Sequence, residues 1–197
     1  SKETGYKTNM YSFAPMQERA RLMKARADQL HRRNDFGLSA DIVKQAIAKR
    51  GDKMVREALS YTAGAQGFKV VEAANNGHKK TYLASCREMY KAAGYDVVAV
   101  ARNNQGKDQF KKAGFSKGVL TYRDFLRRFG DRYTGAKSQS KKVIIVDEAD
   151  QLSPNQDQEI FNTANKIGAK LIYLGSPKAK GKRLWQSLFG YYKLMSS

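Results

Sequence analysis

Two adjacent carboxylates follow a short, wholly apolar segment in the C-terminal half of the chain. Val143-Ile144-Ile145-Val146 leads directly into Asp147 and Glu148. A strand buried in a parallel sheet reads as a continuous apolar run, and ligands of such sheets bind at the carboxyl ends of the strands. In an enzyme that hydrolyses a nucleoside triphosphate, the first carboxylate would hold Mg²⁺ and the second would orient the attacking water. The pattern is therefore typical of a Walker B motif, although a strand can also end in an acidic turn that has no such role.

The glycine-rich turn that should accompany these carboxylates is present only in a degenerate form. Its expected position, after the first strand, holds Asn75, Asn76, Gly77, His78, Lys79, Lys80 and Thr81, preceded by Glu72 and two alanines. A working loop needs several glycines, so that backbone N–H groups can surround the phosphates, and then a Lys and a Ser or Thr. If Gly77 is the last glycine of the motif, His78 replaces the Lys and Lys79 replaces the Ser or Thr.

A shift of one residue would place Lys79 or Lys80 in the lysine position with Thr81 as the hydroxyl, but the glycine spacing then fails. We therefore predict that ATP is not hydrolysed and that no cofactor is required. Residual binding of ATP and Mg²⁺ by this segment is the enzymatic alternative. If ATP is not hydrolysed, as we predict, Asp147 and Glu148 are vestigial, and none of these residues is catalytic.

The charge of the chain is strongly positive. It carries 37 Lys and Arg against 18 Asp and Glu, a formal net charge of +19. Residues 1–60 contribute 13 basic and 7 acidic side chains, and residues 61–197 contribute 24 and 11, so the excess is not confined to a tail. Such a field attracts polyanions, of which phosphate backbones are the commonest. A solvated surface or contact with an acidic protein would give the same composition.

Several classes of protein do not fit the sequence. No run of about 18 apolar residues occurs, so membrane insertion is not expected. Cys86 is the single cysteine, which excludes an internal disulfide and any zinc site with several cysteines. We interpret Cys86 as a small apolar residue on a helix face and expect a cytoplasmic protein.

Short apolar segments alternate with helical patterns after residue 66, which predicts a parallel α/β sheet. Strands are predicted at 68–73, 97–101, 143–147 and 170–174, and helices at 79–93, 110–113, 122–129 and 154–167. The last helix begins with an S-x-x-Q capping box at Ser153. Three helical patterns occupy residues 15–33, 39–50 and 52 to about 64. We therefore predict a RecA-like P-loop NTPase fold over residues 67–197, preceded by a helical N-terminal segment over residues 1–66.

Several further segments carry a resemblance to a known family. They are Arg19–Met23, Ala27–His31, Arg56–Thr62, Lys91–Val97, Asp147–Ala149, Ala164–Gly175 and Trp185–Phe189. From about Arg19 to Phe189 the chain resembles the first RecD-like domain, of superfamily 1 helicases, in Ti-type TraA and MobA conjugative relaxases. In active relatives the relaxase nicks a plasmid strand, and the fused helicase unwinds the duplex for export through a type IV secretion channel. The resemblance implies a role in conjugation and plasmid transfer.

The chain departs from this family where ATP chemistry resides. The family's Gly-Asp-x-x-Gln sensor motif appears here as Gly175-Ser176-Pro177-Lys178-Ala179. With only His31 and His78 available, the chain has no histidine cluster for a nicking metal, and we predict no metal site. The resemblance implies a vestigial helicase-like domain that grips single-stranded DNA. A module recognised by a secretion or other protein partner is the alternative.

Candidate DNA contacts follow from the expected position of the strand, across the carboxyl ends of the sheet. They are Lys79, Lys80, Arg102, Arg127, Arg128, Lys178, Lys180, Lys182 and Arg183. Aromatic residues between them, such as Tyr122, Phe125 and Trp185, suit base stacking, although each could instead be a core residue, and each cation an ordinary surface charge. The expected partners are single-stranded DNA, the relaxase and helicase domains of the same polypeptide, and type IV coupling or secretion proteins.

Overall fold

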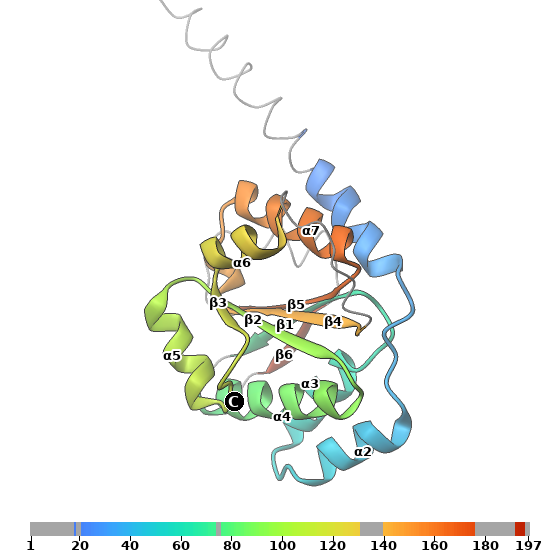
Figure 1. Cartoon of the computed structure of the whole chain (residues 1–197). Helices are drawn as coiled ribbons and strands as arrows, with labels where there is room; N and C mark the ends of the chain where they lie inside the picture. Colours follow the sequence, from blue (N-terminus) through green and yellow to red (C-terminus); the bar gives the residue numbers. More distant parts are fainter. Residues whose placement is uncertain (1–17, 19–20, 74–75, 131–139, 176–191, 196–197) are drawn as a thin grey trace, which may run out of the picture.

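A six-stranded parallel sheet forms the centre of the computed structural model, which describes residues 18, 21–73, 76–130, 140–175 and 192–195 (Figure 1). The strands are β1 (Phe68–Ala73), β2 (Asp96–Ala101), β3 (Val119–Thr121), β4 (Lys142–Val146), β5 (Lys170–Gly175) and β6 (Tyr192–Met195). Their order across the sheet is β3-β2-β4-β5-β1-β6, and every neighbouring pair is parallel. All carboxyl ends therefore lie at one edge of the sheet, and β5 separates β1 from the acidic strand β4.

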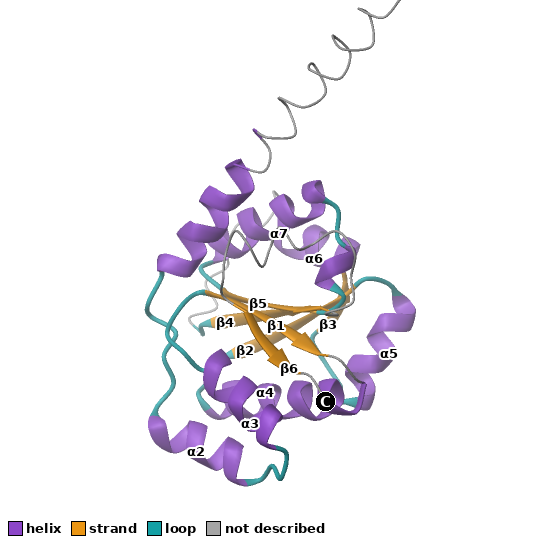
Figure 2. Cartoon of the chain, turned by 180° about the vertical axis from the view of Figure 1, so that it is seen from behind, coloured by secondary structure: helices purple, strands orange, loops and turns teal. Residues whose placement is uncertain are grey.

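Helices cover both faces of this sheet. They are residues 21–32, α2 (Ala40–Ala48), α3 (Lys53–Thr62), α4 (Asn76–Ala92), α5 (Asn104–Lys112), α6 (Tyr122–Phe129) and α7 (Pro154–Ile167). The helix of residues 21–32 lies with α6 and α7 over one face, and α3, α4 and α5 lie over the other (Figures 1 and 2). A 3₁₀ turn, η1 (Ala149–Gln151), follows β4. None of the helices in these described ranges is long and apolar enough to cross a membrane.

The sheet separates two apolar cores. One contains Val55 and Leu59 from α3, packed with Tyr82, Cys86 and Tyr90 of α4. The opposite core contains Met23, Ala27 and Leu30 of the first helix, packed with α6 and α7 side chains such as Phe125 and Phe161. Residues before position 67 therefore contribute to both cores. The predicted boundary at residue 66 stays a prediction.

Most predicted elements are present, and their ends follow local chemistry. The α/β class and the parallel sheet are confirmed, and the four predicted strands match β1, β2, β4 and β5 to within one residue. Ser153 and Gln156 form the predicted capping box at the start of α7. Helix α5 begins earlier than predicted because Asn103 accepts a hydrogen bond from Gly106 N–H at 2.9 Å. Strands β3 and β6 were not predicted, since three or four residues are too few to show a period.

Cys86 has the inert environment expected of it. The side chain is fully buried, and burial raises the pKa of its thiol to about 12. A thiol that stays protonated is a poor nucleophile. Cys86 thus acts as a small apolar residue in the core.

Candidate functional site

The candidate site lies at the carboxyl edge of the sheet, where β4 delivers its two carboxylates. Asp147 N–H donates a hydrogen bond to the carbonyl of Val100 at 3.0 Å, which continues the pairing of β4 with β2 for one more residue. The Asp147 side chain is buried, and its Oδ1 accepts a hydrogen bond from Glu148 N–H at 2.7 Å. Glu148 has a φ of 51°, the one positive value among the non-glycine residues described. The backbone therefore turns sharply at the point where the acidic side chains leave the strand.

Lys79 forms an ion pair with Asp147. Its Nζ lies 2.6 Å from Asp147 Oδ2, and the two side chains are 20% and 4% exposed. Because α4 begins at Asn76, Lys79 lies in the first helical turn after Gly77. That turn is where the Lys and the Ser or Thr of a phosphate-binding loop stand, and the Ser or Thr would share Mg²⁺ with the acidic strand. The ammonium of Lys79 thus occupies the place of a cation beside Asp147.

His78, at the position of the phosphate-binding lysine, is also engaged. Its Nε2 lies 2.8 Å from Asp52 Oδ2. Asp52 is the N-cap of α3, and its Oδ1 accepts hydrogen bonds from Met54 N–H at 2.8 Å and Val55 N–H at 3.2 Å. The bond from Val55, supported by that from Met54 and by His78, lowers the pKa of Asp52 against the opposing effect of burial. The start of α4 is thereby tied to the start of α3.

The second carboxylate, Glu148, is directed towards α5. Its Oε2 lies 3.5 Å from the point that a Cβ on Gly106 would occupy. Gly106 belongs to the first turn of α5, which Asn103 caps. The N-terminus of a helix carries partial positive charge, which favours a carboxylate there. The position of Glu148 is therefore accounted for by α5.

These residues do not fit a magnesium-bound nucleotide. The side chains at both loop positions that should bind phosphate and metal contact carboxylates within the protein: His78 contacts Asp52, and Lys79 forms an ion pair with Asp147. Glu72, near the end of β1, is a buried acidic side chain at the same edge of the sheet, where a triphosphate would bring further negative charge. Asn75, another predicted loop residue, lies outside the described residues. We therefore derive no hydrolytic step at this site. Within the described ranges, no three His, Cys, Asp or Glu side chains are grouped to hold a metal ion.

The predicted DNA contacts do not all lie at this edge. Lys80, exposed on α4, and Arg102, exposed after β2, are located there. The expectation that Arg127 and Arg128 share this edge is wrong. Thr121 caps α6 at the end of β3, and the two arginines stand in the last turn, roughly 9 Å further along the helix axis. The sequence prediction placed them by composition and did not follow the direction of the helix.

The local contacts of α6 differ from those expected of a DNA-stacking surface. Arg127 pairs with Asp124, and the Arg128 guanidinium lies 5.1 Å from the centre of the Phe129 ring. Phe125 is fully buried, so its proposed role in base stacking is wrong. The Tyr122 hydroxyl donates a hydrogen bond to Glu159. The predicted contacts Lys178, Lys180, Lys182 and Arg183, together with Trp185, lie outside the described residues.

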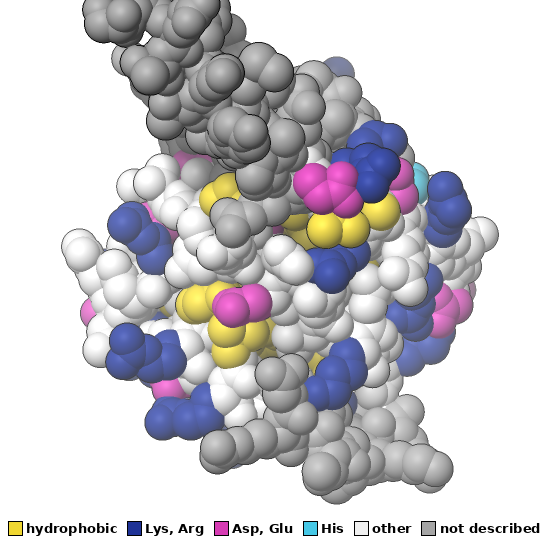
Figure 3. Space-filling view, turned by 90° about the horizontal axis from the view of Figure 1, so that it is seen from above, with side chains coloured by type: hydrophobic (Ala, Val, Ile, Leu, Met, Phe, Trp, Pro, Cys, Tyr) yellow, Lys and Arg dark blue, Asp and Glu magenta, His cyan; other side chains and the backbone are white. Residues whose placement is uncertain are grey.

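The described carboxyl edge carries charges of both signs. Lys79, Lys80 and Arg102 lie there together with Glu72, Asp147, Glu148 and Asp150, which is three cations and four anions. On the face above α6 and α7, basic side chains are also spread out, several of them beside acidic ones (Figure 3). Among the described residues, the positive charge is therefore not concentrated where sheet ligands usually bind.

One basic residue, Lys170, lies inside the fold, and the sequence analysis did not predict this. Lys170 is fully buried, and its Nζ donates hydrogen bonds to the carbonyls of Thr62 at 2.6 Å and Gly64 at 2.7 Å. Burial, with a smaller effect of nearby Lys69, lowers the pKa of Lys170 to about 7. Its ammonium satisfies carbonyls at the C-terminus of α3, where the helix dipole favours a cation. The sequence did contain a sign of this buried lysine, because Lys170 is the first residue of a predicted strand that is otherwise apolar.

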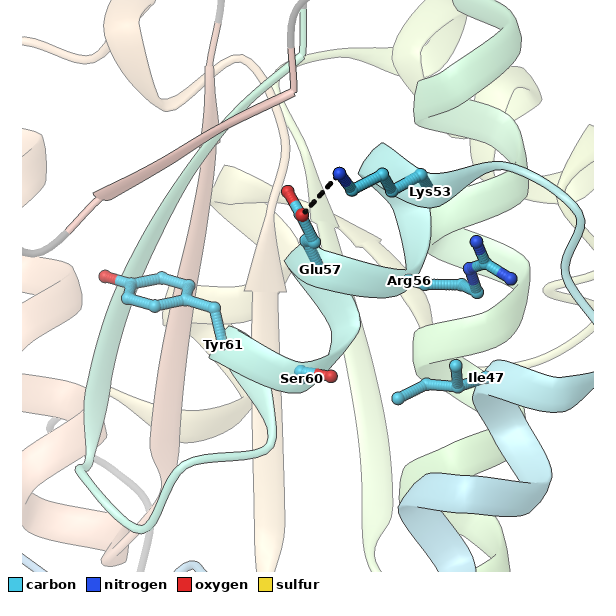
Figure 4. Close-up of a pocket in the computed structure, with 6 residues that line it drawn as sticks. All are labelled: Ile47, Lys53, Arg56, Glu57, Ser60 and Tyr61. Carbon is cyan, nitrogen blue, oxygen red and sulfur yellow. Dashed lines mark ion pairs between the residues drawn. The ribbon is translucent and has the colours of Figure 1, made fainter.

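An open groove of about 700 Å³ lies between α2 and α3 (Figure 4). Its lining residues are Ile47 from α2 and Lys53, Arg56, Glu57, Ser60 and Tyr61 from α3. Lys53 and Glu57 form a loose pair at 4.0 Å. None of the lining residues belongs to the degenerate loop or to the acidic strand. The groove is thus separate from the candidate site.

Comparison with known proteins identifies the family and fold of the chain. Residues 53–180 match the AAA domain family. The chain is 29% identical over 159 residues to the "Probable conjugal transfer protein TraA" of Sinorhizobium fredii, and 26% identical over 172 residues to the "Conjugal transfer protein TraA" of Rhizobium radiobacter. These alignments cover 79% and 85% of the chain but only 14% and 15% of the relatives.

The family match covers more than half of the chain and includes β1 to β5, with both the degenerate loop and the acidic strand. It confirms the predicted RecA-like P-loop fold. The similarity to the two conjugal transfer proteins confirms the predicted resemblance to TraA. The chain therefore belongs to the AAA domain family.

Proposed function

We propose that this chain is a DNA-binding, helicase-like domain of a conjugal transfer protein that holds single-stranded DNA without hydrolysing ATP. The observation that carries the proposal is the 2.6 Å ion pair between Lys79 and Asp147. A P-loop motor needs Asp147 for its metal, and the metal must come and go with each nucleotide. A covalently attached ammonium beside that carboxylate competes permanently with Mg²⁺. The domain would then remain in one conformation, because no nucleotide cycle would switch it.

The DNA partner is supported by charge and by the relatives. A net charge of +19 gives a long-range attraction for phosphate backbones. The relatives over this region are conjugal transfer proteins by name. Helicase-like folds bind single strands through a basic path with sequence-tolerant contacts. The enzymatic alternative, residual ATPase or helicase activity, is disfavoured by the engaged His78 and Lys79.

Nucleotide binding tests the first half of the proposal. The wild-type chain should show no ATP turnover and no Mg²⁺-dependent nucleotide binding in calorimetry. The triple substitution Glu72→Gly, His78→Lys and Lys79→Thr should create Mg²⁺-dependent binding, because it supplies the missing groups and releases Asp147. The same triple substitution with Asp147→Ala is the matched control and should not bind. DNA-stimulated hydrolysis in the wild-type chain, lost on Asp147→Ala, would contradict the proposal.

Salt dependence tests the second half. Binding of an oligo-dT strand should weaken with salt, with a log–log slope of about −0.7 for each contacted phosphate. Lys80→Glu with Arg102→Glu should lower the affinity and flatten the slope, and so should reversal of the basic residues at positions 178, 180, 182 and 183. Reversal of Arg127 and Arg128 should do less, because α6 carries them away from the edge. Equal losses in all three sets would show diffuse binding without a defined path.

A second candidate function, recognition by a protein partner of the secretion apparatus, is favoured by the mixed charges of the described carboxyl edge. Absence of DNA binding at about 50 mM salt, together with retained binding to an acidic protein surface, would make this the better account. Polyglutamate is a suitable probe for that comparison, because it shares the charge of DNA but lacks phosphates and bases.

A further inference from the structure

Helix α5 and the turn after it carry a concentration of positive charge that no role has yet explained. Between positions 102 and 118 there are five basic residues and one acidic residue, Asp108. The basic residues are Arg102, Lys107, Lys111, Lys112 and Lys117. All of them are exposed except Lys107, which is half-buried. We call Lys107, Lys111, Lys112 and Lys117 the α5 shoulder.

The cations of the α5 shoulder are poorly compensated. Lys111 approaches Asp108 at 3.6 Å, with both side chains 62% exposed. In the described part of the chain, the other three lysines of the shoulder have no carboxylate within ion-pair distance. Around the first helix, by contrast, cations are paired: Arg21 with Glu18 at 2.8 Å, Lys24 with Asp28 at 3.4 Å and Arg33 with Asp35 at 3.3 Å. The shoulder is therefore an unneutralised patch in a molecule that pairs many of its charges.

The backbone beneath the shoulder is firmly held. Asn103 caps the start of α5, and the rings of Phe110 and Phe115 pack edge to face with centres 5.2 Å apart. Arg87 of α4 lies over Phe115, with its guanidinium carbon 5.7 Å from the ring centre. Both phenylalanines are buried. The lysines thus project from a rigid base that presents no aromatic side chain of its own.

Helix electrostatics explain only part of this pattern. Lys111 and Lys112 stand in the last turn of α5, where a cation is favoured by the helix dipole. Lys107 stands in the middle of the helix, and Lys117 lies beyond its end. Like charges four residues apart, as at positions 107 and 111, disfavour the helix. The helix dipole therefore does not account for Lys107 and Lys117.

We propose that the α5 shoulder is a second nucleic-acid contact, which binds the phosphate backbone along the flank of the sheet. The proposal rests on the DNA-binding function proposed above and names a surface for it. Nine helical residues extend about 13 Å, the length of roughly four phosphates of one strand at their spacing in B-form DNA. Helix α5 starts at the carboxyl edge beside Arg102, so a strand that crosses this edge can continue along α5 (Figure 1). Because the shoulder offers lysines and no exposed ring, its binding is independent of base sequence.

Charge reversal at the shoulder tests this proposal. The variant Lys111→Glu, Lys112→Glu, Lys117→Glu is compared with the wild-type chain for binding to labelled oligo-dT at several salt concentrations. Three lost phosphate contacts should flatten the log–log slope by about 2 and lower the affinity about a hundredfold at 0.1 M salt. Homopolymers of other bases should give the same difference. Circular dichroism shows whether the variant remains folded.

The matched control reverses three exposed lysines elsewhere, Lys44, Lys49 and Lys53, which changes the net charge by the same amount. If the control loses as much affinity as the shoulder variant, the effect belongs to the overall charge and the proposal is wrong. Unchanged binding by the shoulder variant also overturns it, while leaving the proposed DNA-binding function intact. If the wild-type chain binds polyglutamate but no DNA at low salt, both proposals fail, and the shoulder becomes a surface for an acidic protein.

Discussion

Replacement of Lys79 by methionine should lower the free energy of unfolding by about 3 kcal/mol, the low end of the range for breaking a buried ion pair. The substitution leaves Asp147, a nearly buried carboxylate, without the ammonium at 2.6 Å. Because Lys79 is 20% exposed, water compensates part of the loss, which is why the low end applies. Urea denaturation of the variant measures the change. Lys80→Met is the control, and an exposed lysine should change stability by no more than about 0.5 kcal/mol.

A double-mutant cycle isolates the pair. Asp147→Asn in the Lys79→Met background should recover part of the lost stability, with an interaction energy of about 1–3 kcal/mol between the two sites. Mg²⁺ gives an independent readout. Millimolar Mg²⁺ should leave the melting temperature of the wild-type chain unchanged and raise that of Lys79→Thr, because a ligand that binds only the folded state stabilises it. Stabilisation of the wild-type chain by Mg²⁺, with no coupling in the cycle, would mean that Asp147 serves a metal after all.

The second large effect concerns pH and the buried Lys170. Its pKa is lowered from 10.5 to about 7 in the folded protein, so above pH 7 the unfolded chain binds more protons than the folded one. Stability therefore rises with pH in this range, by up to about 1.4 kcal/mol per pH unit from this single group. The rise in stability with pH ends near pH 9. Burial raises the pKa of Cys86 and of Tyr82, so these groups ionise more readily in the unfolded chain, and their ionisation favours unfolding.

Urea denaturation between pH 7 and 8.5 measures this slope. Lys170→Met should abolish it, since methionine does not titrate. The variant also removes the donors to the carbonyls of Thr62 and Gly64, so the slope, and not the stability at one pH, is the readout. Should Lys170→Met fail to fold, Lys170→Arg keeps a charge at every pH and should likewise lose the slope. Lys91→Met, on the exposed end of α4, is the control and should retain it. If the stability of the wild-type chain does not rise between pH 7 and 8.5, the lowered pKa of Lys170 is contradicted.

Local sequence chemistry was sufficient to predict most of the fold. Buried parallel strands need continuous apolar runs, and β2, β4 and β5 each contain one, whereas β1 also carries Lys69 and Glu72. The capping box at Ser153 lies within four residues, so it is visible without knowledge of the tertiary structure. Short strands such as β3 depend on their neighbours in the sheet, and nothing in three residues reveals them.

The candidate site was only partly predictable, because its key contacts join distant parts of the chain. The loop and the acidic strand were both identified, but the ion pair between Lys79 and Asp147 joins the start of α4, which follows β1, to the end of β4, and β5 separates these two strands in the sheet. The sequence left two alignments of the loop open. The start of α4 at Asn76 and the pairing of Lys79 favour the one in which Lys79 replaces the Ser or Thr. Arg127 and Arg128 were misplaced because composition does not report the direction in which a helix runs.

The first helix and α3 cover opposite faces of one sheet, and this arrangement affects how the chain folds during its synthesis. Leu30 packs in a core that also contains Leu171 of β5, more than one hundred residues later in the chain. A ribosome adding roughly 5–20 residues per second leaves the early apolar helices without their sheet for roughly 7 to 30 seconds. Throughout that interval Met23 and Leu30 lack part of the core in which they are buried. A chaperone that shields the nascent first helix would therefore act before β5 joins β1 to β4 and completes the sheet.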